Sequence, residues 1–122
     1  MKMRVSAVQY HLHTIPSFEQ FAKQVEHYVK TAQEFGAEFV LFPEFITTQL
    51  MSIGDGITIE ELPTFTDAYR SLFSTLAKQT NMHIIGGTHV IKKRIDYIMS
   101  LIYFIPMERL LNRRNYILRQ RK

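Results

Sequence analysis

A single glutamate, Glu44, stands at the end of the strongly apolar stretch 39–42, with one proline between them. Removing an unpaired carboxylate from water is costly, so such a group has its pKa raised or is held by hydrogen-bond donors. Both conditions suit a general base, which accepts a proton from a nucleophile. We therefore expect Glu44 to be a buried catalytic carboxylate. The alternative is a glutamate in the first turn of a following helix, where the helix dipole favours negative charge.

Few other residues have the type and spacing for chemistry. The chain has no cysteine, which excludes disulfides and thiolate metal sites. His11 and His13 have the spacing of a metal-binding pair. However, His27, His83 and His89 stand in contexts that give no zinc pattern, so we expect no metal and no cofactor.

The residues before Glu44 predict a strand, a helix and a second strand. Residues 3–9 alternate as a strand does, and a helical pattern of apolar residues begins at Ser17 and ends near Gly36. The stretch 39–42 is the second, shorter strand. A strand–helix–strand unit of this length favours a right-handed parallel crossover. Glu44 is then expected at the carboxyl end of its strand, where the ligand sites of α/β sheets gather.

The residues after Glu44 predict a second helix and a third strand. Residues 45–51 are expected to form a short helical turn, and residues 53–63 a loop that borders the site. Apolar residues recur at helical spacing from 64 to 80, and the aromatic residues of both helices are interpreted as core. Residues 83–91 are the third strand, in which Gly86-Gly87 allows a bulge or a close approach of two backbones.

Composition predicts one domain at most, because the chain has 122 residues of which 46% are hydrophobic. No apolar run reaches the roughly 18 residues that span a bilayer, and no signal peptide begins the chain. We therefore expect a cytoplasmic protein without membrane contact. Charge is uneven: residues 1–91 hold 6 basic and 9 acidic side chains, whereas residues 92–122 hold 9 and 2. The two parts differ in kind.

Three segments are similar, in order and spacing, to one enzyme family: Val5-Ser6-Ala7-Val8-Gln9, Phe42-Pro43-Glu44 and Ile84-Ile85-Gly86-Gly87-Thr88. Over residues 3–91 the chain resembles the carbon-nitrogen hydrolase, or nitrilase, superfamily. Residues 42–50 further resemble a bacterial branch of it. The resemblance implies an α/β fold. Residues 1–91 would form the N-terminal part of a nitrilase-type α-β-β-α sandwich, which this chain leaves incomplete.

The resemblance also implies a mechanism. Enzymes of this family hydrolyse small amides or nitriles through a thioester, with a Glu-Lys-Cys triad. Glu44 matches the general base, which takes the proton of the thiol. The chain has no cysteine, no lysine in the family's Lys-x-His context, and no serine arranged as a substitute nucleophile. Family members are also considerably longer. We therefore expect a fragment that keeps only the glutamate and is inactive by itself.

Residues 92–122 form a basic tail in which the family pattern is not visible. A shift of the reading frame would explain this tail. Joining the third base of each codon to the first two of the next permits only Leu across Asp96 and Tyr97, and only Gly across Met107 and Glu108. With suitable codons elsewhere, the shifted frame spells a Lys-x-His segment like that of the family. We expect an insertion or deletion of one or two bases near codons 91–96.

Two other roles are open at this stage. Tyr103, Phe104 and Tyr116 lie among basic residues, as in proteins that stack and neutralise single-stranded nucleic acid. Shifted codons also produce such tails by chance, and no RNA-binding motif is visible, so nucleic acid is not the favoured partner. A second copy of the chain is the other candidate partner, because an incomplete sandwich exposes apolar surface and favours a homo-oligomer or aggregation.

Overall fold

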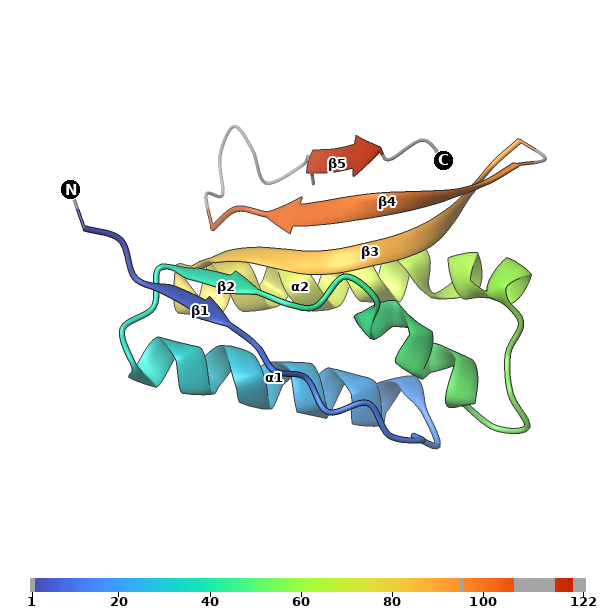
Figure 1. The fold of residues 1–122 in the computed structure, drawn as a ribbon, viewed down its shortest axis with the longest axis horizontal. Coiled ribbons are helices and arrows are strands. Elements are labelled where there is room, and N and C mark those ends of the chain that lie inside the picture. The colour runs from blue at the N-terminus through green and yellow to red at the C-terminus, as the bar shows by residue number, and fades with distance from the viewer. Residues whose placement is uncertain (1, 95, 107–115, 120–122) are drawn as a thin grey trace.

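The computed structural model describes residues 2–94, 96–106 and 116–119. Two α-helices, two 3₁₀ helices and five strands make up this part of the chain (Figure 1). In chain order they are β1 (Val5–Ala7), α1 (Phe18–Glu34), β2 (Phe39–Leu41), η1 (Ile46–Ser52), η2 (Ile59–Phe65), α2 (Thr66–Thr80), β3 (His83–Lys93), β4 (Asp96–Phe104) and β5 (Tyr116–Arg119).

The described strands form one sheet in the order β1-β2-β3-β4-β5. β1, β2 and β3 are parallel to one another, and β4 and β5 are antiparallel to their neighbours. Leu41 of β2 pairs with Ala7 on one side and with Ile85 on the other. The predicted parallel crossover of the first two strands is confirmed, and so is the α/β fold class.

Local sequence signals set the ends of both helices. Ser17 caps α1, since its hydroxyl accepts a hydrogen bond from the backbone N–H of Gln20 at 3.4 Å. Gly36 follows α1 with a φ of 74°, a left-handed conformation that glycine adopts without strain. Asn81 ends α2 in the same region, with a φ of 55°. These three boundaries agree with the prediction.

Three elements were missed in the sequence: η2, β4 and β5. The segment 53–63 was predicted as a loop, but η2 begins at Ile59, behind a capping box of Thr58 and Glu61. β4 lies in the segment where no family pattern or regular period was visible. Its apolar residues occupy both faces of the strand, so the sequence shows no alternation of apolar and polar residues. Pairing with β3 defines the strand.

The core lies between the sheet and the two α-helices, which pack on the same face of it (Figure 1). Phe73 of α2 makes an edge contact with Phe42 and stacks on Phe104, with ring centroids 5.4 Å apart in both cases. The buried side chains of the helices are Phe21, Val25, Val29 and Ala32 from α1, and Tyr69, Phe73, Leu76, Ala77 and Thr80 from α2. Three of the six predicted core aromatics are therefore buried, and Phe18, Tyr28 and Phe65 pack against this core partly buried.

The opposite face of the sheet carries no helix from the described ranges (Figure 1). Phe39, His83 and Tyr103 form an aromatic cluster there, all three half-buried. The rings of Phe39 and His83 stack at 4.4 Å, and His83 Nδ1 lies 2.6 Å from the hydroxyl of Tyr103. No helix in the described part of the chain is long and apolar enough to cross a membrane.

A bulge interrupts β3 between Ile85 and Thr88, where the register with β4 shifts. Gly87 lies in this bulge with a φ of 72°. A Cβ atom on Gly87 would stand 2.5 Å from the backbone oxygen of Pro43 and 3.2 Å from that of Glu44. The predicted close approach of two backbones is therefore confirmed, and its partner is the turn that follows β2.

We predict that Gly87→Ala destabilises the fold more than the matched variant Gly54→Ala. Both glycines have a positive φ, 72° and 62°, so the alanine strain is similar, but a Cβ on Gly54 meets nothing within 4 Å. Overpacking against a backbone atom adds about 2 kcal/mol to the loss for Gly87→Ala. Urea unfolding of both variants measures the difference. Equal losses would show that the Pro43–Glu44 turn does not lie against the bulge.

Candidate active site

Glu44 lies in a turn that follows the carboxyl end of β2. Its position beyond a parallel strand is the predicted one. Its side chain is exposed, however, so the expectation of a buried carboxylate is wrong for this chain. The helix alternative also fails, because Glu44 precedes Phe45, the N-cap of η1, and lies outside the first turn.

The backbone carbonyl of Glu44 is held by Thr88 of β3. It accepts a hydrogen bond from the Thr88 N–H at 2.8 Å and another from the Thr88 hydroxyl at 2.6 Å. The bulge at Gly87 lets these two donors approach the turn, because glycine has no side chain and a Cβ atom there would collide with the turn. Thr88 itself is buried. The glutamate is therefore fixed at its backbone while its carboxylate faces outward.

His89, the next residue of β3, is fully buried between three elements. Its Nδ1 lies 2.6 Å from the hydroxyl of Thr47, its Nε2 lies 3.1 Å from the hydroxyl of Thr66, and its ring stacks on Tyr69 at 4.7 Å. Burial lowers the pKa of His89 to about 4, and the positive charge of Arg70 acts in the same direction. His89 is therefore neutral at pH 7. Sequence reasoning had considered it only as a metal ligand.

Gln49 is a second residue that sequence reasoning missed. It is buried in η1, where its Oε1 accepts from the Tyr10 hydroxyl at 2.5 Å. Its Nε2 donates to the His13 carbonyl at 3.1 Å and to Oε1 of Gln24 at 2.9 Å. Burial raises the pKa of Tyr10, and Tyr28 adds a smaller effect in the same direction. The Gln49 amide therefore connects η1 to α1 and to the segment after β1. In the sequence, only the family resemblance of residues 42–50 pointed to this residue.

The remaining candidates have structural roles. Ser52 accepts from the Ile15 N–H at 3.0 Å and donates to the Gln49 carbonyl at 2.7 Å, so its hydroxyl is engaged away from any base. His11 and His13 stack with ring centroids 5.5 Å apart. Within residues 2–94, 96–106 and 116–119, no three His, Cys, Asp or Glu side chains are grouped so that they could hold a metal ion.

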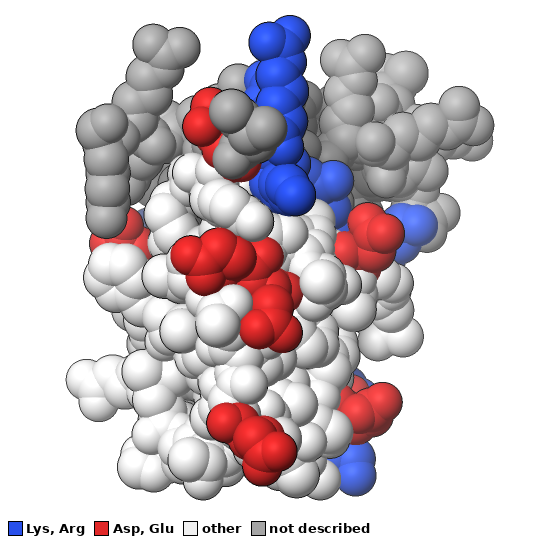
Figure 2. All heavy atoms as spheres, turned by 90° about the vertical axis from the view of Figure 1, so that its right-hand side faces the viewer, with Lys and Arg blue, Asp and Glu red and all other residues white. Residues whose placement is uncertain are grey.

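The end of the sheet that carries Glu44 is acidic. Residues 44–67 include five acidic side chains and no basic one. Figure 2 looks onto the end of the molecule toward which β2 runs, and acidic side chains are scattered over the middle and lower part of this face. Basic side chains gather at its top, over the hairpin of β3 and β4, where Lys92, Lys93 and Arg94 are exposed. The surface formed by residues 44–67 is therefore acidic, and the basic side chains of this face belong to the β3–β4 hairpin.

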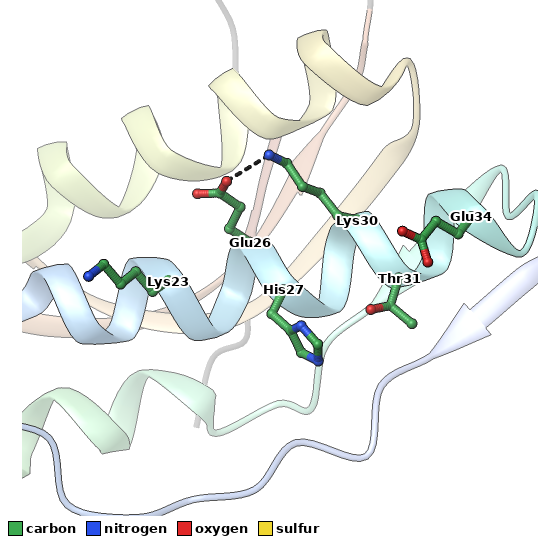
Figure 3. A pocket seen from close by; sticks show the side chains of 6 residues that line it. All are labelled: Lys23, Glu26, His27, Lys30, Thr31 and Glu34. Atoms are coloured by element: carbon green, nitrogen blue, oxygen red, sulfur yellow. Dashed lines mark ion pairs between the residues drawn. The ribbon is translucent and has the colours of Figure 1, made fainter.

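A shallow hollow lies along the exposed side of α1 (Figure 3). All of its lining residues belong to this one helix, and Figure 3 shows that their side chains point in different directions. Glu26 and Lys30 form an exposed ion pair of 2.8 Å, one helical turn apart. The hollow is a solvated helix face, and it has no convergent catalytic groups. Its lining residues are Lys23, Glu26, His27, Lys30, Thr31 and Glu34.

Stability is predicted to fall as the pH falls from about 6.5 to about 4, because of His89. In that interval the unfolded chain takes up a proton on this histidine and the folded chain does not, so acid favours unfolding. The full effect is about 3 kcal/mol, present above pH 6.5 and lost by pH 4. Urea unfolding across this range should show a shallower pH dependence for His89→Gln. His27→Gln leaves His89 in place and should keep the parent slope; an unchanged slope in His89→Gln would contradict the assignment.

The sequence and the structure of the chain were compared with those of known proteins. The family model for carbon-nitrogen hydrolase matches residues 4–122. The chain is 40% identical over 95 residues to the probable hydrolase YhcX of Bacillus subtilis (strain 168), over 75% of this chain. It is also similar to a carbon-nitrogen hydrolase from Helicobacter pylori G27, with a TM-score of 0.72, 13% identity and 97% of this chain covered. Saccharomyces cerevisiae Nit3, of branch 10 of the nitrilase superfamily, matches with a TM-score of 0.66, 13% identity and 94% coverage.

The chain spans only part of these proteins: 18% of the Bacillus protein, 39% of the Helicobacter chain and 43% of the yeast chain. The two solved structures support the nitrilase-type fold, with the described sheet and helices as part of it. The matched family model includes residues 92–122, so the proposed division of the chain at residue 91 stays a prediction. Since the family model matches nearly the whole sequence, the chain belongs to the carbon-nitrogen hydrolase family.

Proposed function

We propose that this chain supplies the general base of a carbon-nitrogen hydrolase, and that Glu44 is that base. The observation that carries the proposal is the position of Glu44 in a family member: it follows a parallel strand, its backbone is held by two donors of Thr88, and its side chain is exposed. A base must reach its proton within about 3 Å, so a fixed backbone next to an accessible carboxylate suits the task.

The reaction follows from the family's triad. The carboxylate of Glu44 takes the proton of a cysteine thiol as the sulfur attacks the carbonyl or nitrile carbon, and a lysine stabilises the charge that develops. For an amide, the C–N bond then breaks and the amine leaves with a proton. Water hydrolyses the thioester, with the glutamate again as base. The acidic residues of the segment 44–67 near Glu44 make anionic amides the least suitable substrates.

This chain by itself lacks the nucleophile, because it contains no cysteine. We propose that it is a fragment of a hydrolase and is inactive alone. The chain covers less than half of the length of each of these relatives, which is consistent with this view. A shifted reading frame after codon 91 would account for the missing lysine and cysteine. The nucleotide sequence of the locus tests this idea: if no insertion or deletion restores the family pattern, the idea fails.

Nucleic-acid binding is the weaker alternative. Phe104, one of the aromatic residues expected to stack on bases, is buried against Phe73 in the core. Tyr103 is half-buried, with its hydroxyl on His83. The basic residues Arg109 and Arg113 lie outside the described residues. Association with a second copy fits better, because one face of the sheet carries half-buried aromatic side chains, and no helix of the described residues lies over them.

The role of Glu44 can be tested in a graft. Residues 3–91 of this chain would replace the matching segment of the Bacillus relative, whose remaining sequence follows unchanged. We predict that the graft hydrolyses members of a panel of small uncharged amides and nitriles. Glu44→Gln should lower its kcat/KM about 10²- to 10⁴-fold, the usual effect of losing a general base. The control Glu60→Gln changes an exposed carboxylate in η2 and should have little effect.

Two results would contradict the proposal. The first is a graft whose activity is unchanged by Glu44→Gln. The second is amide turnover by the isolated chain that Glu44→Gln abolishes: it would keep Glu44 as the base but contradict the inactivity of the chain alone, since it would require a nucleophile other than cysteine. Labelling the graft's cysteine with iodoacetamide shows whether the nucleophile is reactive. A reactive thiol in both the parent graft and its Glu44→Gln variant, together with equal turnover, would exclude Glu44 specifically.

A further inference from the structure

We propose that His89 is a positioning residue for Glu44, because it fixes the two contacts that hold the turn of the glutamate. These two attachments are the contact at Thr47 and the contact at Thr88. The inference rests on the proposed function of Glu44 as general base. His89 does not touch the carboxylate in this structure. It acts through Thr47, which follows Glu44 in the chain, and through Thr88, which holds the carbonyl of Glu44.

The imidazole joins three elements that are separate in the sequence. It belongs to β3, contacts Thr47 of η1 through Nδ1, and contacts Thr66 at the start of α2 through Nε2. The ring lies nearly parallel to that of Tyr69, at an interplanar angle of 16°. With both nitrogens engaged and one ring face stacked, the side chain has a single position. It can therefore act as a fixed reference point for the elements that it contacts.

The first attachment is the start of η1. This short 3₁₀ helix begins at Ile46, and its N-cap residue Phe45 makes no side-chain capping hydrogen bond. Short 3₁₀ helices have poor hydrogen-bond geometry and depend on outside contacts. The contact between Thr47 and His89 supplies one, in the first turn and three residues after Glu44. It limits how far the chain can rotate on the C-terminal side of the glutamate.

The second attachment is Thr88, the residue directly before His89. Successive side chains of a strand point to opposite faces, so seating His89 among the helices turns the side chain of Thr88 away from them. This orientation brings the Thr88 hydroxyl to the Glu44 carbonyl at 2.6 Å, beside the N–H at 2.8 Å. If the imidazole of His89 left its buried position, the bulged strand could rotate. The N–H and the hydroxyl of Thr88 would then move together.

A histidine is suited to this task because both partners are hydroxyls. Thr47 is fully buried, and without the imidazole its hydroxyl would lose the hydrogen bond that it has here. The competing explanation is that His89 only fills the core. Core filling and positioning differ in one consequence: a core defect weakens the fold as a whole, whereas loss of a positioning contact opens the Glu44 turn first.

The test is amide hydrogen exchange at single-residue resolution, on the whole chain at low micromolar concentration. The reporter is the Thr88 N–H, which donates to Glu44. The internal control is the Phe42 N–H, which donates to Ile85 at 2.9 Å in the same sheet before the bulge. In His89→Ala we expect exchange at Thr88 to become about tenfold faster or more, relative to Phe42.

A second variant separates the two contacts of the imidazole. His89→Asn places an amide near the position of Nδ1, so it keeps a partner for Thr47 and loses the one for Thr66. We expect Thr88 exchange in this variant to stay within about threefold of the parent, relative to Phe42. His89→Gln, whose amide lies near the position of Nε2, should resemble His89→Ala.

Three outcomes would overturn the proposal. Equal acceleration at Thr88 and Phe42 in His89→Ala would show that the histidine only supports the core. No acceleration at Thr88 would show that the attachment does not depend on it. Equal selective loss in the Asn and Ala variants would show that the Thr47 contact has no part. None of these results depends on turnover, so they are separate from the graft experiment that tests Glu44 as the base.

Discussion

The arrangement of this chain around Glu44 depends on one backbone oxygen. The carbonyl of Glu44 accepts two hydrogen bonds from Thr88, one from the N–H and one from the hydroxyl. These donors reach it because β3 bulges at a glycine that leaves room for the turn after β2. The bulge shifts the register of β3, and this shift in turn leads His89 into the core. The β3 bulge thus connects the candidate catalytic residue Glu44 with His89 and its contacts to η1 and α2.

The sheet is covered on one side only in the described part of the chain. Both α-helices pack on the same face, and aromatic side chains lie half-buried on the other. The chain also spans less than half of the two solved structures that it resembles. The exposed Glu44 side chain and a sheet face without a helix from the described residues fit the proposal that this chain holds one part of a larger active site.

Local signals in the sequence predicted the elements whose ends they mark. Ser17, Gly36 and Asn81 bound the helices, and Gly86-Gly87 indicated the close approach of two backbones. The burial of Glu44 could not be predicted in this way, because burial depends on what closes over the sheet end. The parallel order of β1 and β2 followed from general rules of chain connection. β4 was missed because its apolar run has no alternation until β3 pairs with it.

The buried polar contacts were the least predictable part of the site. His89 and Gln49 each satisfy partners from distant segments, and no pattern in a single sequence says which hydroxyl or amide will meet which. The family resemblance marked the region of Gln49 but not its contacts. Glu44 was found because it follows a strand and matches a family motif. Its supporting residues emerge only when the three-dimensional arrangement is known.

The most direct test of the central claim is the scalar coupling across the hydrogen bond between the Thr88 nitrogen and the Glu44 carbonyl carbon, measured by NMR on doubly labelled chain. The account predicts a detectable coupling at this pair, comparable to that between Phe42 and Ile85 in the neighbouring ladder. Absence of the Thr88 coupling, in spectra where the Phe42 coupling is seen, would contradict the claim that β3 holds the glutamate in place.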